Sequence, residues 1–140
     1  MNEEHISFKL DKSNIKPVSL AIAETIRANG ADFVDYIMKA LVASDLFDEE
    51  TKNELRTITD EKEIEDRFYK ELEFGTGGLR GIMGAGPNRM NRYTIAKATK
   101  GYADYLMSRF DGEISVAIAY DSRNNSKYFS QVAAGVLSAN

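Results

Sequence analysis

The N-terminal half of the chain places apolar side chains at helical spacing, which predicts four helices. Pro17 suits the first turn of the first helix, and Gly30 suits its end. Asp48 is placed to cap the third helix, and Asp60 followed by Glu63 forms a capping-box-like start for the fourth. The apolar positions are Leu20, Ile22, Ala23 and Ile26 in the first helix, Phe33, Val34, Ile37, Met38 and Leu41 in the second, and Leu55 and Ile58 in the third. We expect these acidic helices to be a structural lead-in that packs on another part of the protein.

The pattern changes after the fourth helix. Leu72 and Phe74 lie on one side of a short extended run, and the glycine-rich residues 75–90 predict a loop. Asn91 is a good N-cap for a helix that runs to about Phe110. The apolar stripe expected to face the core of that helix consists of Ile95, Ala98, Tyr102, Tyr105 and Leu106.

The C-terminal part of the chain adds a strand and a helix. The continuous apolar run Ile114–Tyr120 is typical of a strand buried on both faces. A polar loop over residues 121–127 leads to an amphipathic helix over residues 128–139. The alternation of strands and helices predicts an α/β fold, as an incomplete α/β/α layered domain with a mainly parallel sheet, preceded by N-terminal helices. An early hairpin-like pairing stays open.

A sheet of this kind normally needs another strand after its last helix. An unpaired strand edge would then be exposed, and we expect marginal stability or self-association through it.

Composition excludes several classes of protein. Hydrophobic residues make up 43% and charged residues 29%, a globular balance. The sequence has no apolar run long enough for a membrane span and no secretory signal at its start. Cysteine is absent, which excludes disulfides and fits a cytoplasmic protein. No spacing of residues predicts a metal site, and the only histidine, His5, lies in the N-terminal arm.

Charge divides the chain unevenly. The net charge is −4, yet residues 75–103 contain no acid, so this stretch is a candidate anion site or a chance cluster on a solvated face. Nucleic acid is a weak candidate partner because the chain is acidic and its aromatic residues are expected in the core. The bases of the acid-free stretch are Arg80, Arg89, Arg92, Lys97 and Lys100.

The strongest local motif is FGTGGLRG, residues 74–81, at the start of that stretch. Glycines allow the backbone to approach a ligand, and successive amides can form an anion nest. Thr76 adds a hydroxyl and Arg80 a forked donor that matches phosphate, so we expect phosphate recognition by Thr76, Gly77, Gly78 and Arg80, with Gly81 in support. A structural glycine turn is the alternative. The spacing fits neither a dinucleotide fingerprint nor a Walker loop.

Two further segments are weaker candidates. Arg89 and Arg92 flank the start of a helix, where anions bind well, or they simply solvate a loop. Asp121 and Arg123 follow the expected strand at the edge where parallel α/β sheets bind ligands, and we favour a role for Asp121 in bracing Arg123. No nucleophile and base pair stands out.

The run LEFGTGGLRGIMGAGPNRMN, a long helix and then AIAYDSR resemble the first domain of α-D-phosphohexomutases, over about residues 45–140. The resemblance implies an N-terminal arm with helices over residues 1–44 and a partial first domain over residues 45–140. The similarity is greatest to the type-2 phosphoglucomutase and phosphopentomutase branch. It implies a reversible phosphate shift on a sugar, through a phosphoserine and a sugar bisphosphate such as glucose 1,6-bisphosphate, with Mg²⁺ bound in the full-length enzyme. By similarity, Arg80 would lie beside the phosphoserine and contact the transferring phosphate.

The chain departs from that family where the chemistry should occur. The chain has no TASHNP-like serine loop, and none of the chain's serines stands in such a pattern. Hence no catalytic residue or metal ligand is expected in these residues, and we expect a truncated, inactive form of a phosphosugar mutase. A non-catalytic phosphate- or phosphosugar-binding module is the alternative.

Overall fold

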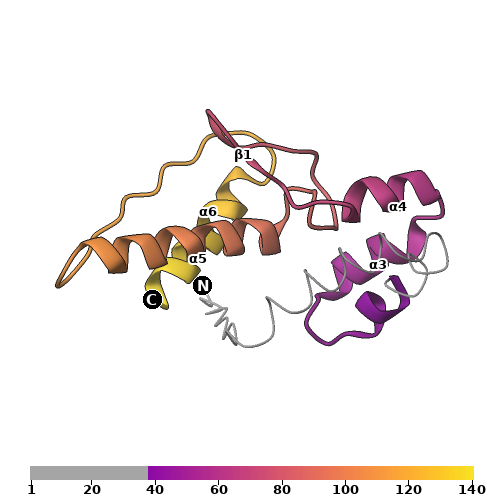
Figure 1. Cartoon of the computed structure of the whole chain (residues 1–140), viewed down its shortest axis with the longest axis horizontal. Coiled ribbons are helices and arrows are strands. Elements are labelled where there is room, and N and C mark those ends of the chain that lie inside the picture. The colour runs from indigo at the N-terminus through magenta and orange to yellow at the C-terminus, as the bar shows by residue number, and fades with distance from the viewer. Residues whose placement is uncertain (1–37) are drawn as a thin grey trace. The chain divides into compact units, whose positions relative to one another are not determined.

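The computed structural model describes residues 38–140, which fall into two compact units (Figure 1). One unit ends at Asn91 and the other begins at Arg92. The expected first helix lies outside the described residues, as does most of the second, of which residues 38–43 are helical. Among the described helices, none combines the length and the apolar character that crossing a membrane requires.

Two short helices follow, and both begin at the predicted caps. Helix α3, Glu49–Thr57, starts after Asp48, whose carboxylate accepts a 2.8 Å hydrogen bond from the Thr51 amide. Helix α4, Glu61–Phe68, starts after Asp60, whose carboxylate accepts a 3.0 Å hydrogen bond from the Lys62 amide. Each cap satisfies an amide that has no partner within its helix, so the two predicted starts are confirmed.

The apolar faces of α3 and α4 form the core of the first unit. Leu55, Ile64 and Phe68 are buried together with Met38, and Ile58 packs against them. The core also includes Ala85, which is 2% exposed and belongs to the glycine-rich segment. The acidic helices were expected to pack on another part of the protein, and the glycine-rich segment is that part.

A small hairpin stands at the start of the glycine-rich segment. Strand β1, Phe74–Gly75, pairs with strand β2, Gly78–Leu79, in antiparallel register, and Thr76 and Gly77 form the connecting loop. The hairpin that the sequence left open is thus present. In the described part of the chain this is the only sheet, so the expected parallel sheet is not seen there.

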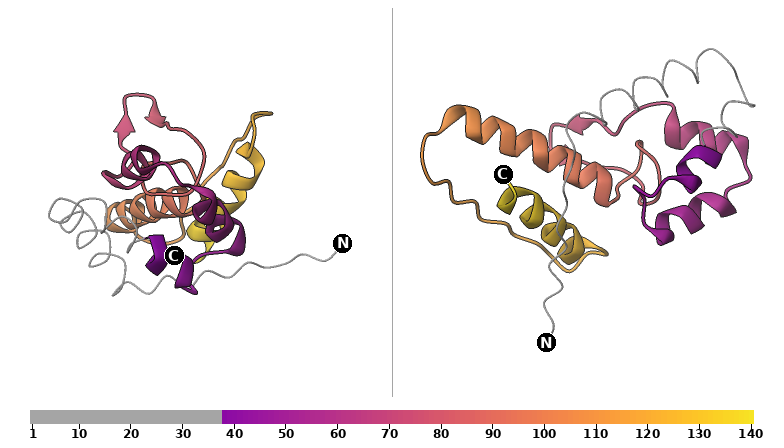
Figure 2. Two further views of the ribbon diagram at one scale, coloured as in Figure 1. Left: turned by 90° about the vertical axis from the view of Figure 1, so that its right-hand side faces the viewer. Right: turned by 90° about the horizontal axis from the view of Figure 1, so that it is seen from below.

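The second unit is built on two helices that pack against each other, α5, Arg92–Arg109, and α6, Ser126–Ser138 (Figure 2). Both were predicted to within about two residues. The predicted core stripe of α5 is wrong in part, because Tyr102 and Tyr105 are 50% and 54% exposed. Ala103 is buried instead, since its small side chain allows a neighbouring segment to approach closely.

The segment Ile114–Tyr120, expected to be a buried strand, is neither strand nor helix and is mostly exposed. None of its backbone groups forms a hydrogen bond with another backbone group of residues 38–140. A strand exists only when a neighbour pairs with it, and these residues provide none. The strand prediction is therefore wrong for this structure.

Candidate functional site

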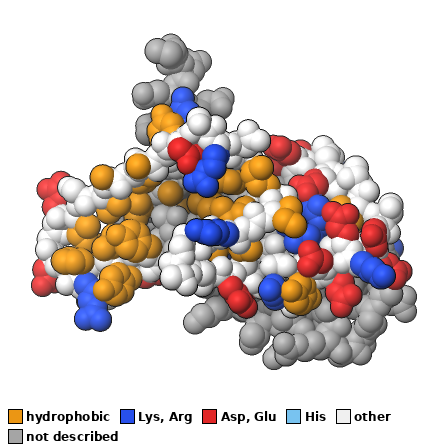
Figure 3. Space-filling model, turned by 90° about the horizontal axis from the view of Figure 1, so that it is seen from above, with side chains coloured by type: hydrophobic (Ala, Val, Ile, Leu, Met, Phe, Trp, Pro, Cys, Tyr) orange, Lys and Arg blue, Asp and Glu red, His pale blue; other side chains and the backbone are white. Residues whose placement is uncertain are grey.

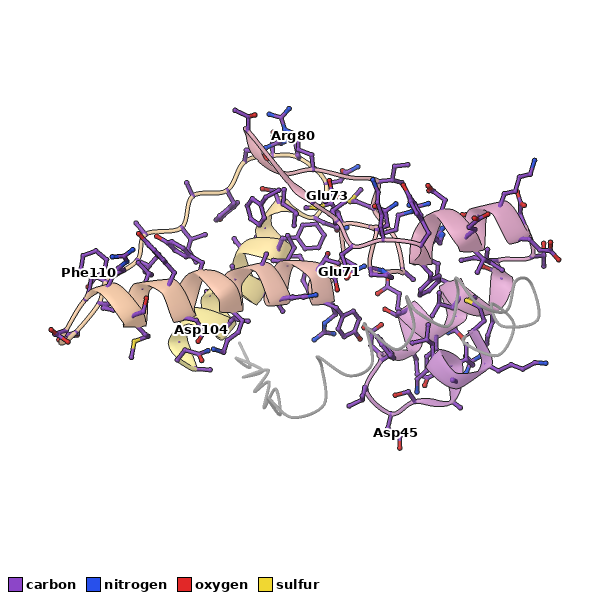
Figure 4. All side chains as sticks on the ribbon, viewed as in Figure 1. Asp45, Glu71, Glu73, Arg80, Asp104 and Phe110 are labelled. Atoms are coloured by element: carbon purple, nitrogen blue, oxygen red, sulfur yellow. The ribbon has the colours of Figure 1, made fainter. Side chains whose placement is uncertain are left out.

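The hairpin and the residues beside it surround an open hollow of about 340 Å³. Figure 4 shows the Arg80 side chain at the outer end of the hairpin, with Glu73 on the leg that leads into it. The hollow is lined by Glu73, Gly75, Thr76, Gly77, Gly78 and Arg80. Four of the predicted phosphate-binding residues, Thr76, Gly77, Gly78 and Arg80, are thus brought together.

Glycines determine the shape of this hairpin at two positions. Gly78 has φ +98°, a conformation that residues with a β-carbon rarely adopt. At Gly77 the need is for space, because a β-carbon there would lie 2.5 Å from Nη2 and 3.2 Å from Cζ of Arg80. The guanidinium therefore rests directly against the hairpin loop.

Arg80 is exposed and available to a ligand. Within residues 38–140 it forms no hydrogen bond and no ion pair. Arg80 lines the hollow beside three glycines, and Thr76 adds a hydroxyl-bearing side chain to the same hollow. Such a group of donors can hold a phosphate through charge-assisted, bidentate hydrogen bonds.

Arg67, by contrast, is buried and engaged on every side. Its Nη1 donates to Glu54 Oε1 at 2.6 Å and to the Ala85 carbonyl at 2.9 Å, and its Nη2 donates to Glu63 Oε1 at 2.7 Å. Burial acts to lower the pKa of Arg67, but the hydrogen bonds and charges of the two carboxylates outweigh it and raise the pKa above its usual value. Arg67 is therefore a permanent structural cation.

Arg89, a supporting candidate from the sequence, also has a carboxylate partner. It is 5% exposed, and its Nη2 donates to Asp66 Oδ2 at 2.6 Å. The neighbouring Asn88 side chain donates to the Asp66 carbonyl at 2.7 Å, and the Asn88 amide donates to the Arg67 carbonyl at 3.0 Å. Arg89 is thus placed to attach the glycine-rich segment to α4, and a role in binding phosphate stays a prediction.

Gly81 lies at the base of the hairpin and does not line the hollow. A β-carbon on Gly81 would lie 2.5 Å from Leu72 Cδ1, so the two legs of the hairpin approach closely there. The Leu72 amide donates to the Pro87 carbonyl at 2.9 Å, and the Met90 amide donates to the Ile82 carbonyl at 2.8 Å. Both legs are therefore anchored to the segment that follows.

The remaining candidates, Asp121 and Arg123, form an exposed pair in the second unit. The backbone amide of Arg123 donates to Asp121 Oδ1 at 3.1 Å, and the side-chain Nε of Arg123 donates to Asp121 Oδ2 at 2.7 Å. The backbone hydrogen bond and then the side-chain hydrogen bond of Arg123 lower the pKa of the Asp121 carboxyl. This is the bracing geometry that the sequence favoured.

Comparison with known proteins supplies the family. The model of the phosphoglucomutase/phosphomannomutase family, alpha/beta/alpha domain I, matches residues 71–140, half of the chain. The chain belongs to this family. A phosphoglucomutase of Staphylococcus haemolyticus is 43% identical over 75 residues, 54% of this chain and 14% of that protein. Another, of Staphylococcus saprophyticus, is 40% identical over 103 residues, 74% of this chain and 18% of that protein.

This member of the family spans less than a fifth of the length of these curated relatives. No solved structure matches it. The matched residues include the whole hairpin and Arg80, whereas α3 and α4 lie before them. The family's α/β/α domain and its isomerase chemistry agree with the resemblance seen in the sequence.

Sequence reasoning missed two residues that bind the backbone of the glycine-rich segment, Glu54 and Arg67. Glu63 and Arg67 are four residues apart on a helix, so their pairing could have been read from spacing. The contact of Glu54 with Arg67 and Ala85 joins residues far apart in the sequence, and no local pattern reveals it.

Proposed function

We propose that this chain supplies part of the phosphate-handling surface of a phosphoglucomutase, and that Arg80 is its main contact with the phosphosugar. One observation carries the proposal: Arg80 is exposed and without a partner in the described residues, beside a glycine-lined hollow. Arg67, Arg89 and Arg123 are each bound to a carboxylate. Family membership supports a phosphosugar as the ligand.

The proposed reaction of the longer protein is a reversible shift of phosphate on a sugar, such as glucose 1-phosphate to glucose 6-phosphate. In that reaction Arg80 would bind and orient the phosphate and offset its charge, while Thr76, Gly77 and Gly78 shape the loop around it. The 140 residues contain no phosphoserine loop of the family's kind. We therefore expect no isomerisation of glucose 1-phosphate by this chain alone.

The family's Mg²⁺ does not enter the proposed role of these residues. In residues 38–140 no three side chains of His, Cys, Asp or Glu come together as a metal site. The described residues do not fit the ion, and no step in the proposal runs through it. A cytoplasmic site of action is also part of the proposal, supported by the cysteine-free sequence.

A direct titration tests the phosphate contact. Glucose 1,6-bisphosphate is added to the wild-type chain and to Arg80→Ala, and binding is followed by calorimetry. Arg109→Ala is the matched control, because Arg109 is also exposed. Within the described residues its side chain forms no hydrogen bond or ion pair and lies over the Tyr105 ring. We expect weaker binding only in Arg80→Ala. Equal binding by all three proteins would remove Arg80 from the site.

We also propose that Ile114–Tyr120 becomes a strand of a mainly parallel sheet when a neighbouring strand is present. Its apolar side chains line a hollow of about 410 Å³ against α5 and α6, and hydrophobic side chains gather on the surface of this unit (Figure 3). Val116 and Ile118, which line this hollow, are 38% and 39% exposed. In the chain by itself, we expect this edge to promote self-association.

A further inference from the structure

Helices α3 and α4 lie before the residues matched by the family's domain, yet two of their side chains hold the segment on which the hairpin stands. Glu54 Oε2 accepts a 3.0 Å hydrogen bond from the Ala85 amide. Arg67 Nη1 donates to the carbonyl of the same residue at 2.9 Å. Both backbone groups of Ala85, which is 2% exposed, are therefore bound by one ion pair.

The glycines beside Ala85 allow this close approach. A β-carbon on Gly84 would lie 2.7 Å from Glu54 Oε1, and one on Gly86 would lie 2.9 Å from the Arg67 carbonyl oxygen. The side chain of Asn91 also donates to the carbonyls of Gly84 and Gly86, each at 2.9 Å. The segment Gly84–Gly86 is thus held by side chains from three parts of the chain.

Hydrogen bonds continue from this segment to both legs of the hairpin. Pro87 accepts from Leu72, which precedes the hairpin, and Met90 donates to Ile82, which follows it. The Gly84 amide also donates to the Met90 carbonyl at 3.2 Å. A displacement of Gly84–Gly86 would therefore reach both ends of the hairpin that carries Arg80.

We infer that the Glu54–Arg67 pair positions the phosphate-binding hairpin by fixing Ala85. The two residues do not contact the ligand. They act on Ala85, and its chain neighbours pass the effect on: Pro87 accepts from Leu72, and Gly84 donates to Met90, which donates to Ile82. This inference rests on the proposed function for its consequence for binding. Its structural part, the position of Arg80, is testable without any ligand.

The test compares Glu54→Gln with Glu63→Gln in the 140-residue chain. Both variants remove one carboxylate from Arg67, but only Glu54 also accepts from Ala85. The readouts are the NMR signals of the Gly77 and Gly78 amides and of Arg80 Nε–H, and the dissociation constant for glucose 1,6-bisphosphate. Both are recorded well below the melting temperature of each variant, so that a loss of stability alone changes neither.

We expect Glu54→Gln to shift the three hairpin signals and to weaken binding roughly threefold to tenfold, while Glu63→Gln leaves both near wild type. If Glu54→Gln does not fold, Glu54→Asp, which keeps the charge near Arg67, replaces it. Equal effects of the two positions, or unmoved hairpin signals, would overturn the inference. If the wild-type chain does not bind the bisphosphate, the proposed function fails, and the hairpin signals alone decide the positioning role.

Discussion

The guanidinium of Arg80 occupies the space beside Gly77 that any side chain at that position would need. A β-carbon on Gly77 would lie 2.5 Å from Arg80 Nη2, well inside ordinary van der Waals contact. Gly77 and Gly78 therefore have different roles in the hairpin. Gly78 provides a backbone conformation with φ +98°, whereas Gly77 leaves room for the arginine. The direction in which Arg80 presents its donors thus depends on the absence of one carbon atom.

The first prediction concerns that space. In Gly77→Ala the guanidinium must move away from the hairpin loop, so its donors leave the hollow. We expect the dissociation constant for glucose 1,6-bisphosphate to rise roughly tenfold, which corresponds to about 1.4 kcal/mol. Isothermal calorimetry measures it, and the unfolding midpoint should change little because Gly77 is exposed.

Gly75→Ala is the matched control for this substitution. It adds the same methyl group to the same hairpin, but its β-carbon would lie 3.7 Å from the Gly78 carbonyl oxygen, an ordinary contact. Binding should stay near wild type in this variant. If Gly75→Ala weakens binding as much as Gly77→Ala, the effect comes from the hairpin backbone and not from Arg80.

The second prediction compares two glycines whose replacement by alanine should change stability in opposite directions. Gly86 has φ +120°, and a β-carbon there would lie 2.9 Å from the Arg67 carbonyl oxygen. We expect Gly86→Ala to lower the free energy of unfolding by about 2 kcal/mol or more. Gly101 lies within α5 with open space around it, so Gly101→Ala should raise the free energy by roughly 0.5–1 kcal/mol.

Urea denaturation followed by circular dichroism measures both variants. Because the two glycines belong to different compact units, the transition of each unit is the quantity to compare. A stable Gly86→Ala protein would mean that the segment around Ala85 can move away from Arg67 at little cost, against the tight packing described above.

Local rules predicted the elements whose causes are local. Asp48 and Asp60 cap helices because a short carboxylate can reach an amide two or three residues ahead, and this depends only on spacing. Asn91 directly precedes α5 as expected. The FGTGGLRG motif brought Thr76 and Arg80 to one hollow because a two-residue loop between paired strands leaves few alternatives.

Features that depend on distant partners could not be predicted in this way. Ile114–Tyr120 has the composition of a buried strand, but a strand also needs a neighbour, and residues 38–140 offer none. Tyr102 stands at a helical spacing from the other apolar residues of the predicted stripe, yet Ala103 is the buried residue. The closely packed face of α5 requires a small side chain. The contact between Glu54 and Ala85 spans 31 positions and follows from the folded structure alone.

The third prediction is a pH dependence at Asp121. The backbone and then the side chain of Arg123 stabilise the charged carboxylate, so its pKa in the folded chain lies below the unfolded value of about 3.9. A lowered pKa means that this stabilisation is present above the unfolded value and is lost as pH falls through the folded value. We therefore expect the loop before α6, which contains Asp121 and Arg123, to stay ordered until the pH falls below the unfolded pKa of Asp121. Its order should be lost as the pH then passes through the folded pKa.

Carboxyl carbon NMR across an acid titration measures this midpoint directly. In Arg123→Gln the side-chain hydrogen bond and charge are removed, and the Asp121 midpoint should move up toward the ordinary aspartate value. Lys127→Gln removes a positive charge nearby in the sequence and serves as the control, because no hydrogen bond joins Lys127 to Asp121 among the described residues. A midpoint that is the same in wild type and Arg123→Gln would contradict the bracing role.

The last prediction concerns the unpaired segment Ile114–Tyr120. The backbone groups of this apolar segment form no hydrogen bond with other backbone groups of residues 38–140. The segment can therefore pair with the same segment of a second copy, as exposed strand edges do. We expect sedimentation velocity of the wild-type chain to show association that increases with protein concentration. Ile118→Lys should shift that association to concentrations roughly tenfold higher or more, because a charged side chain on an edge opposes pairing.

Gln131→Lys is the control for this substitution, because it adds the same charge to an exposed position of α6 and should have little effect. If both lysine variants reduce association equally, net charge governs it and the segment is not the contact; a wild-type chain that stays monomeric at every concentration would refute the prediction altogether.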